Sequence, residues 1–494
     1  MGSQPSDQVV KLAKVVGWVA IMASAVAQEY GAGINVVATS SIGTYPGIGN
    51  LVPLAMLVAG LILLPKVFMF QRFGSVISTS GGEYTWMSRT IHPRVGFYIH
   101  FLYFAGVVAG MGFLAYSVGL VLASTLVGLG ISSGVWFATP IGHLVIGLIV
   151  IWLIFALHYT GVRNYAIFVI ILLAIVLAAA SISIVVGFAT PSAIFIKAVA
   201  NNFFHGSIPS ITLPPLTYNA FFGTVVLFIF AYAGLSAAPL LGGETKNPKK
   251  DMPRGIWGGW LIVLVLFTLV ALAVFHVMPA QVAYVLVKSK YSYYATVPGI
   301  ISLVAPKYLG DILSILVLII LAKTIAPEMM ATSRTLYEWS VDYILPKIFG
   351  HVNKFKAPDF SLFVAALIGT LFLMDTIVIG VPIVVIRSLS VLLVIVFLGI
   401  GVLLTSRKKE KKDWEKAITD VSMIAAAIAG IIVALIFIPS VIIVPHVPLL
   451  LQPSFQSVIS LIIAAIIYEA ARIYRKRRNG FDLNEMIKSY IPPE

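Results

Sequence analysis

Long apolar segments separated by short polar ones follow one another along almost the whole chain. A helix needs about 20 apolar residues to cross the hydrocarbon core of a bilayer, and the pattern predicts about twelve such helices. They cover residues 15–41, 50–70, 95–127, 141–158, 164–189, 218–242, 256–278, 311–340, 359–379, 381–405, 419–444 and 454–473. The third and the eighth are longer than a bilayer requires and are expected to be tilted. The chain is therefore predicted to be an all-α polytopic membrane protein with a single transmembrane domain over residues 1–494.

Two of these segments contain small residues at their middle. The first has Gly31 and Gly33 within AVAQEYGAGINVV, and the sixth has Gly234 beside Tyr232 in FAYAGLSAAP. A helix that breaks in lipid leaves backbone groups that protein, water or a ligand must satisfy. Because the sixth helix comes an odd number of helices after the first, the two would cross the membrane in opposite directions, as in transporters built from inverted repeats. A small-residue packing face is the alternative reading of the first helix.

Composition agrees with this class and excludes others. Hydrophobic residues make up 60% of the chain and charged residues 11%, whereas soluble domains carry about 25% charged residues. The absence of cysteine excludes disulfides, thiolate metal sites and a cysteine nucleophile. The sequence also lacks a P-loop, an HExxH motif and any apolar segment with clustered histidines and carboxylates. We therefore expect no enzyme activity, no catalytic residue, no metal and no cofactor.

The net charge of +14 comes from the polar segments between the spans. If the even-numbered loops and both termini are cytoplasmic, most of the 33 lysines and arginines lie on that side, as the positive-inside rule requires. This assignment counts Lys66 among the cytoplasmic charges and leaves Lys323 and Arg387 within spans. It predicts a multi-pass protein of the cell membrane with both termini in the cytoplasm. The basic loops lack the interleaved aromatic residues of a nucleic-acid module, and the basic tail is expected to anchor the last helix, with an anionic-lipid site as the alternative.

Four motifs resemble those of one transporter family. In the sixth segment, YAGLSAAPLLGGETKNP resembles the signature YIGFDAVSTLAEEVKNP of the amino acid, polyamine and organocation (APC) superfamily. In the first, GAGIN is similar to the G-(S/A)-G-I-F motif of that superfamily, with Asn35 in place of the apolar residue. Two polar segments, SGGEYTWMSRTIHPRVGF and SRTLYEWSVDYILPKIFGHV, resemble PRSGGEYTYLREAFGPLLGF and SRLLYALARDGLLPKFFARV, although Tyr343 replaces the usual glycine. The resemblance to amino-acid permeases spans roughly Gly31 to Val352.

The resemblance implies an architecture and a function. The fold would contain two inverted five-helix repeats, residues 15–189 and 218–405, followed by two additional helices over residues 417–474. The protein would be a secondary active transporter of amino acids that alternates access around broken helices 1 and 6, by proton-coupled symport or by exchange. Its partners would be an amino acid or amine, protons and membrane lipid, and no nucleic acid. A transporter of polyamines or other organic amines is one alternative, and a membrane sensor or channel of the same architecture is another.

The candidate substrate site lies at the two breaks. The N-terminus of a half-helix carries unpaired N–H groups and partial positive charge, which suit a substrate carboxylate, and here these groups belong to Ala32, Gly33 and Ile34. The substrate amine would meet free carbonyl groups near residues 28–30 and near Tyr232. The predicted substrate-binding residues are Gln28, Glu29, Tyr30, Gly31, Ala32, Gly33, Ile34, Phe230, Tyr232, Ala233, Gly234 and Leu235.

Leu235 is expected to influence selectivity. The APC superfamily usually has a phenylalanine at this position, and that ring commonly covers the substrate. The smaller Leu235 should therefore admit a larger or less strictly selected side chain, with Tyr232 as the aromatic wall. Packing of Leu235 against the third helix is the alternative.

The coupling residues are expected to be Glu29 and Lys323. Many proton-using members of the superfamily carry a lysine on the fifth helix, and this chain has none there. Each intramembrane charge costs roughly 2.5 to 3.5 kcal/mol to insert alone, so both should face the bundle interior and have partners. We expect Lys323 to replace the missing cation near Ala27 and Tyr30, with Glu29 as its partner or as a contact of the substrate amine. A fixed structural ion pair is the alternative, with Glu328 as a rival partner for Lys323.

Overall fold

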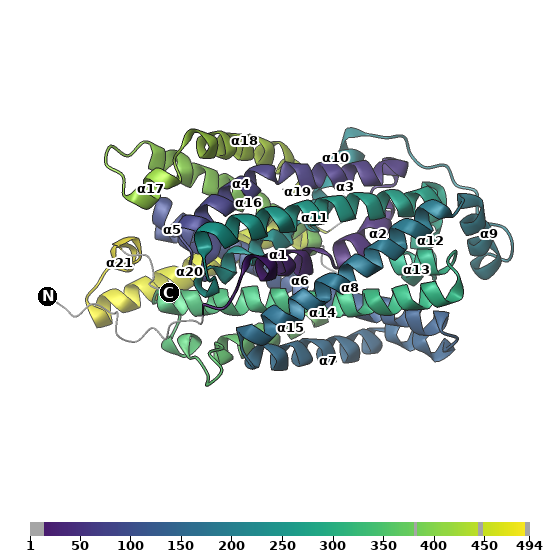
Figure 1. The fold of residues 1–494 in the computed structure, drawn as a ribbon, viewed down its shortest axis with the longest axis horizontal. Coiled ribbons are helices and arrows are strands. Elements are labelled where there is room, and N and C mark those ends of the chain that lie inside the picture. The colour runs from purple at the N-terminus through teal and green to yellow at the C-terminus, as the bar shows by residue number, and fades with distance from the viewer. Residues whose placement is uncertain (1–13, 380–382, 443–447, 490–494) are drawn as a thin grey trace.

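The chain folds into a bundle of long helices (Figure 1), and the computed structural model describes residues 14–379, 383–442 and 448–489, among which there is no β-strand. Ten helices within these residues are long and apolar enough to cross a membrane. They are Pro46–Val76, which contains α3 (Val52–Ile62) and α4 (Leu64–Val76); α6 (Pro93–Gly128); α7 (Pro140–Tyr159); α8 (Val162–Ala189); Tyr218–Glu244, which begins with α10 (Tyr218–Ile229); α11 (Pro248–Val277); α14 (Lys307–Val341); α15 (Asp359–Val378); α16 (Ile383–Ser406); and α20 (Pro453–Asn479). The all-helical polytopic class is therefore confirmed.

Two predicted segments have no long helix in this set. The first is divided into short pieces, and the eleventh forms α18 (Val421–Phe437), a helix of 17 residues. The number of about twelve spanning helices consequently stays a prediction. The third and eighth segments form the two longest helices, α6 with 36 residues and α14 with 35.

The first segment is broken close to its middle. Helix α1 (Trp18–Glu29) ends where Tyr30 leaves the helical region, with φ −77° and ψ 81°. The chain resumes as a π-helix, η2 (Gly33–Val37), and continues as α2 (Ala38–Thr44). Single π-turns of this kind occur often at functional sites. The break lies where the two glycines predicted it.

The sixth segment is also broken. Helix α10 (Tyr218–Ile229) is followed by two 3₁₀ helices, η5 (Ala233–Ala237) and η6 (Pro239–Glu244). The two breaks touch each other: a Cβ added to Gly33 would lie 2.8 Å from the Cα of Ala231 and closer still to its Cβ. The glycine is therefore required for the close approach of the two interrupted helices.

Short helices cover the two ends of the bundle. Figure 1 shows α5 (Gly82–Thr90), α17 (Asp413–Ala417) and α21 (Leu483–Ser489) at one end, which we call the α5 end. At the other end lie α9 (Ser192–Phe203), α12 (Ala280–Lys288) and α13 (Val297–Ser302). Helix α20 runs to the α5 end and continues to Asn479, past the predicted limit of residue 473, because its last charged turns extend beyond the apolar segment.

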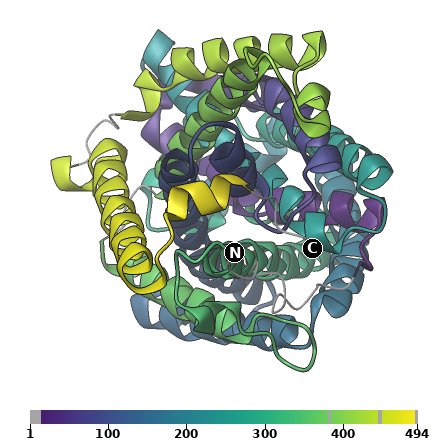
Figure 2. The same ribbon diagram turned by 90° about the vertical axis from the view of Figure 1, so that its left-hand side faces the viewer.

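Helix α1 lies in the interior of the bundle. Its residues 23–29 are all buried, and it packs against α8, α11, α14 and η5. Figure 2, seen from the α5 end, shows α18 and α20 on the outside. Any ligand that reaches the breaks must therefore pass between helices of the core.

Candidate functional site

A small cavity lies where the two breaks meet. The centre of a water molecule has about 10 Å³ in which to move, close to the minimum for one bound water. Helices α1, α6, α14 and α16, the π-helix η2 and the two residues that follow α10 all contribute to its wall. The lining residues are Gln28, Glu29, Ala32, Gly33, Leu114, Phe230, Ala231, Thr324, Glu328 and Arg387. The site is closed in this conformation.

The predicted site residues divide into two groups. Gln28, Glu29, Ala32, Gly33 and Phe230 line the cavity. The others surround it without lining it: Tyr30, Gly31, Ile34, Tyr232, Ala233, Gly234 and Leu235. Sequence reasoning missed Leu114, Ala231, Thr324, Glu328 and Arg387 as members of the wall.

The two tyrosines of the predicted set point away from the cavity. The Tyr232 hydroxyl donates to the carbonyl of Met56 at 3.2 Å. Its ring and that of Tyr30 lie 5.0 and 5.7 Å from the ring of Phe267 on α11. The aromatic side chain on the cavity wall is instead Phe230.

The small residues at the breaks hold the backbones close together. A Cβ on Gly234 would lie 2.7 Å from the backbone nitrogen of Glu29, and one on Gly31 would lie 2.8 Å from the Thr324 methyl group. Because the first residues of a helix have no intrahelical acceptor, the N–H groups of Gly33 and Ile34 at the start of η2 have no backbone partner outside their own helix among the described residues. These donors are suited to an anionic group.

A buried ion pair closes one side of the cavity. Arg387 on α16 pairs with the carboxylate of Glu328 on α14. The side-chain amide of Gln28 donates to the other oxygen of Glu328 at 3.0 Å. All three side chains are at most 4% exposed. The pair therefore joins α14 and α16 to the end of α1, and Glu328 is not the partner of Lys323.

Glu29 has a different environment. The Lys66 ammonium and the Arg387 guanidinium act on its carboxylate electrostatically, and the Leu235 N–H makes a long backbone hydrogen bond to it. Neither carboxylate oxygen has a hydrogen-bond partner within 3.5 Å among the described residues. A buried carboxylate without such partners is costly, and Glu29 lines the cavity. It is therefore available to a proton or to a cationic group of a ligand.

Lys323 binds the backbone of α1. Its ammonium donates to the carbonyl of Ala27 at 2.7 Å, next to the point where the helix ends and its carbonyl groups lose their partners. No ion pair joins Lys323 to Glu29 among the described residues. The expected position of Lys323 near Ala27 is confirmed, and the helix terminus supplies its acceptor in place of Glu29.

Lys66 forms a second buried cluster, although the sequence counted it among the cytoplasmic charges. Its ammonium donates to the Ser236 hydroxyl at 2.7 Å, and that hydroxyl donates to Glu83 at 2.5 Å. Lys66 and Glu83 are 3.7 Å apart, with both side chains at most 2% exposed. The cluster joins α4, η5 and α5.

Further ion pairs close the α5 end. Arg89 of α5 binds Asp342 in a bidentate manner, at 2.8 and 2.9 Å, and Arg334 of α14 binds Glu244 of η6 at 2.8 Å. Each of these side chains is at most 4% exposed. The second of these pairs joins α14 to the broken sixth segment through η6.

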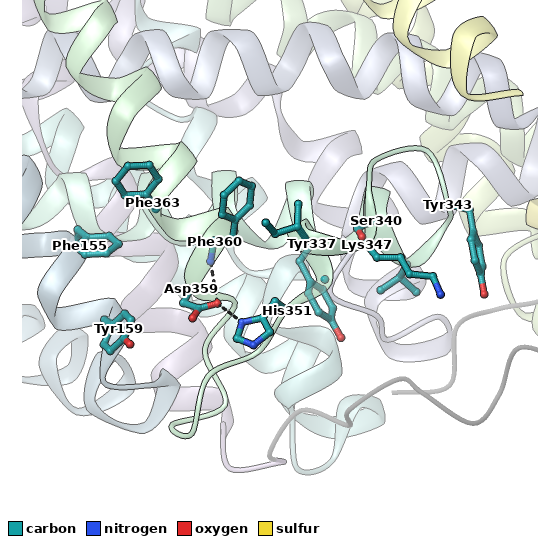
Figure 3. Close-up of a pocket in the computed structure, with 13 residues that line it drawn as sticks. Phe155, Tyr159, Tyr337, Ser340, Tyr343, Lys347, His351, Asp359, Phe360 and Phe363 are labelled. Atoms are coloured by element: carbon teal, nitrogen blue, oxygen red, sulfur yellow. Dashed lines mark hydrogen bonds and ion pairs between the residues drawn. The ribbon is translucent and has the colours of Figure 1, made fainter. Parts of the chain in front are cut away.

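A larger hollow lies elsewhere. Its volume is about 850 Å³, and its wall includes Phe155, Tyr337 and Lys347. Figure 3 shows this hollow with His351 and Asp359 in its wall, where Nδ1 of His351 lies 2.7 Å from Oδ1 of Asp359. None of its lining residues belongs to either break. The hollow is therefore separate from the two breaks.

Comparison with known proteins adds independent information. A sequence model of the family described as amino acid permease matches residues 15–468. A branched-chain amino acid permease of Lactococcus lactis is 26% identical over 359 residues, which cover 68% of this chain and 72% of that protein. An amino-acid permease of Candida albicans is 26% identical over 354 residues, covering 70% of this chain and 53% of that protein. A methylthioribose transporter of Bacillus subtilis is 24% identical over 343 residues, covering 66% and 68%.

Proposed function

This chain belongs to the amino acid permease family, and we propose that it is a secondary transporter that moves amino acids across the cell membrane by alternating access. The observation that carries the proposal is the contact of two interrupted helices, Gly33 against Ala231, at a buried cavity. Interrupted helices expose backbone groups at the depth where a transporter binds its substrate. The small volume of the cavity fits an occluded conformation.

The proposed architecture consists of two inverted five-helix repeats, residues 15–189 and 218–405, and two additional helices over residues 417–474. Helices α1 with η2 and α10 with η5 hold corresponding positions in the two repeats. Both are interrupted after an α-helical half. Rocking of one group of helices against the other would open the cavity to each side in turn.

The substrate would be held mainly by backbone groups. Its carboxylate would accept hydrogen bonds from the N–H groups of Ala32, Gly33 and Ile34, at the positive end of η2. Its amine would meet the Glu29 carboxylate and nearby carbonyl groups. Phe230 would cover the side chain. Leu235 would influence which side chains fit, through its packing behind the break.

Counterflow of a labelled amino acid in proteoliposomes tests this function. Proteoliposomes preloaded with unlabelled substrate should accumulate the labelled substrate transiently. A channel would instead carry current without saturable exchange. Competition by the twenty amino acids and by common polyamines then ranks substrates. A preference for polyamines would establish the organic-amine alternative, which the free Glu29 carboxylate also supports.

We also propose proton coupling through Glu29, with Lys323 as a fixed cation at the end of α1. Protonation would remove the charge that holds the substrate amine, so a proton and the substrate would compete for Glu29 and their movements would be coupled in opposite directions. Uptake is measured in Glu29→Gln and Lys323→Ala under an imposed pH gradient, with and without sodium. Proton-driven accumulation that persists in both variants would refute the mechanism. Loss of pH dependence with exchange retained would support it.

The proposed orientation places the α5 end in the cytoplasm, with both termini. The absence of native cysteine permits a direct test with single introduced cysteines. Asp413→Cys, at the start of α17, should react with a membrane-impermeant maleimide only after cells are opened. Ser207→Cys, beside α9, should react in intact cells. The reverse pattern would invert the topology.

A further inference from the structure

The arginines at the end of α20 differ in their partners. Arg472 pairs with Glu469 at 3.3 Å and with Asp482 at 3.2 Å. Arg475 and Arg478 follow on the next two turns, and neither forms an ion pair with a described residue. Two guanidinium groups near the membrane surface therefore lack a counter-charge from the described part of the chain.

These two arginines are nevertheless held in place. The Nε of Arg475 donates to the carbonyl of Tyr343 at 3.0 Å, and its guanidinium lies 5.4 and 5.5 Å from the rings of Tyr343 and Tyr474. Arg478 donates to the Tyr474 hydroxyl and lies 5.6 Å from that ring. Such contacts orient a guanidinium group without neutralising its charge.

A groove of about 720 Å³ separates α20 from the loop that follows α14. Three cations line it, Arg475, Arg478 and Lys347; Lys347 and Tyr343 also appear in Figure 3. The rest of the wall is mostly apolar and includes Ile344, Leu345, Ile467, Ala470 and Ala471. Ile467 lies about 12 Å before Arg475 along the helix axis, so the apolar wall extends from the cations toward the middle of the bundle.

The groove is accessible from the bilayer. Only 17% of the apolar window of α20 is buried inside the protein, and Figure 2 shows this helix on the outside of the bundle. Its exposed side chains include Ile462, Ile463, Ile466 and Ile473. A ligand that fits both the wall and the cations must carry an anionic head and an apolar chain.

We propose that this groove binds an anionic phospholipid from the adjacent leaflet. Its phosphate is held by Arg475, Arg478 and Lys347, and an acyl chain lies along Ile467 and Ala471. Arginine forks bind phosphate through paired N–H groups, and basic clusters at the ends of membrane helices attract anionic lipids. The proposal does not depend on which solute the protein transports.

The lipid would act on the loop that closes the α5 end. Tyr343 adopts a left-handed backbone conformation, with φ 60°, which is unfavourable for a residue with a Cβ. Arg475 binds the carbonyl of this residue, and the preceding Asp342 binds Arg89 of α5. A phosphate that fixes Arg475 therefore stabilises the ion pair between the loop and α5.

Native mass spectrometry of the full-length protein in detergent tests the proposal. Dissociation constants are measured for phosphatidylglycerol and for phosphatidylcholine of the same acyl chains, and the melting temperature is recorded with each. The test variant is Arg475→Gln/Arg478→Gln. The matched control is Lys476→Gln/Arg477→Gln, which removes the same charge from the same turns but from residues that do not line the groove.

Each basic residue near a membrane surface strengthens the binding of an anionic lipid about fivefold, and this factor sets the expected change. The dissociation constant for phosphatidylglycerol should rise about 25-fold in the test variant and clearly less in the control, whose residues do not line the groove. Phosphatidylglycerol should raise the melting temperature of the wild type but not of the test variant. Equal losses in both double variants, or none in the test variant, would overturn the proposal.

Two additional measurements keep the test decisive. If the double variant does not fold, Arg478→Gln alone should raise the dissociation constant about fivefold, and an unchanged value would contradict the site. Glycerol phosphate at millimolar concentration should not displace the lipid, because it lacks the acyl chain. Displacement would show a simple phosphate site and would overturn the assignment to lipid.

Discussion

Substitution of Gly33 by alanine tests the contact on which the proposed function rests. Gly33 does not need a left-handed backbone, since its φ lies outside that region. Alanine can therefore adopt the same backbone conformation, and the substitution adds only a methyl group. That methyl would lie 2.8 Å from the Cα of Ala231 and closer to its Cβ, whereas carbon atoms in contact are about 3.5 to 4.0 Å apart.

The size of the effect follows from this overlap. The two interrupted helices must separate by roughly 1 Å to restore normal contact. Overpacking of this kind typically costs about 1 to 3 kcal/mol, which corresponds to about a 5- to 150-fold change in an equilibrium constant. The closed conformation bears that penalty, so transport should fall by a factor in this range while the protein still inserts.

The assay is counterflow of labelled substrate in proteoliposomes with equal amounts of monodisperse protein. Gly17→Ala is the matched control, because a Cβ there meets no atom within 4 Å. Adding Ala231→Gly to Gly33→Ala removes the Cβ overlap but not the contact with the Cα, so it should restore transport only in part. Wild-type transport in Gly33→Ala, or a double variant no better than the single one, would refute the reasoning.

Three other changes test the buried charges and one helix cap. Arg387→Met should destabilise the protein by about 3 to 5 kcal/mol because it leaves Glu328 as a buried unpaired charge. Adding Glu328→Met should recover most of the lost melting temperature, and a double variant as unstable as the single one would contradict this. Glu29→Gln should leave the melting temperature unchanged or higher, since a buried carboxylate without a hydrogen bond shorter than 3.5 Å is lost, yet should abolish pH-driven uptake. Burial and the charge of Lys488 lower the pKa of His92, which caps α6, below its ordinary value of 6.5, so stability is lost as pH falls through 6.5 toward the folded pKa. His92→Asn keeps a capping acceptor that does not titrate. Below pH 6.5 this variant should therefore be about 1 kcal/mol more stable than a wild type whose His92 is protonated, and thermal melts of both proteins above and below pH 6.5 would show the difference.

The helix breaks could be predicted from the sequence because their causes are local. Glycine and alanine within an apolar segment allow close backbone approach, and the cost of a broken helix in lipid makes a binding site the natural reason. The same reasoning placed Gln28, Glu29 and Gly33 at the cavity, where the structure has them. It did not resolve side-chain direction: Tyr232 belongs to the second break, but its hydroxyl points to Met56.

The buried charge pairs could not be predicted because their partners are distant in sequence. Arg89 and Asp342 are separated by 253 positions, and no local pattern connects them. Lys66 follows an apolar run, and a lysine in that position commonly marks the membrane surface. Only the packing of α5 over Lys66 reveals that it forms a buried cluster with Glu83. Lys323 took a backbone carbonyl as its acceptor, a partner that every helix end provides whatever its sequence.

The kind of contact that closes the α5 end bears on how the protein would open. A buried ion pair is worth little in net free energy, because the attraction of its charges is largely offset by the loss of their hydration. When water enters between the helices, the separated charges recover that hydration, so opening costs far less than separating an apolar surface of the same area. Pairs of this kind therefore permit two conformations of similar free energy, which alternating access requires. At this end Lys66–Glu83 joins α4 to α5, Arg89–Asp342 joins α5 to the loop after α14, and Arg334–Glu244 joins α14 to η6.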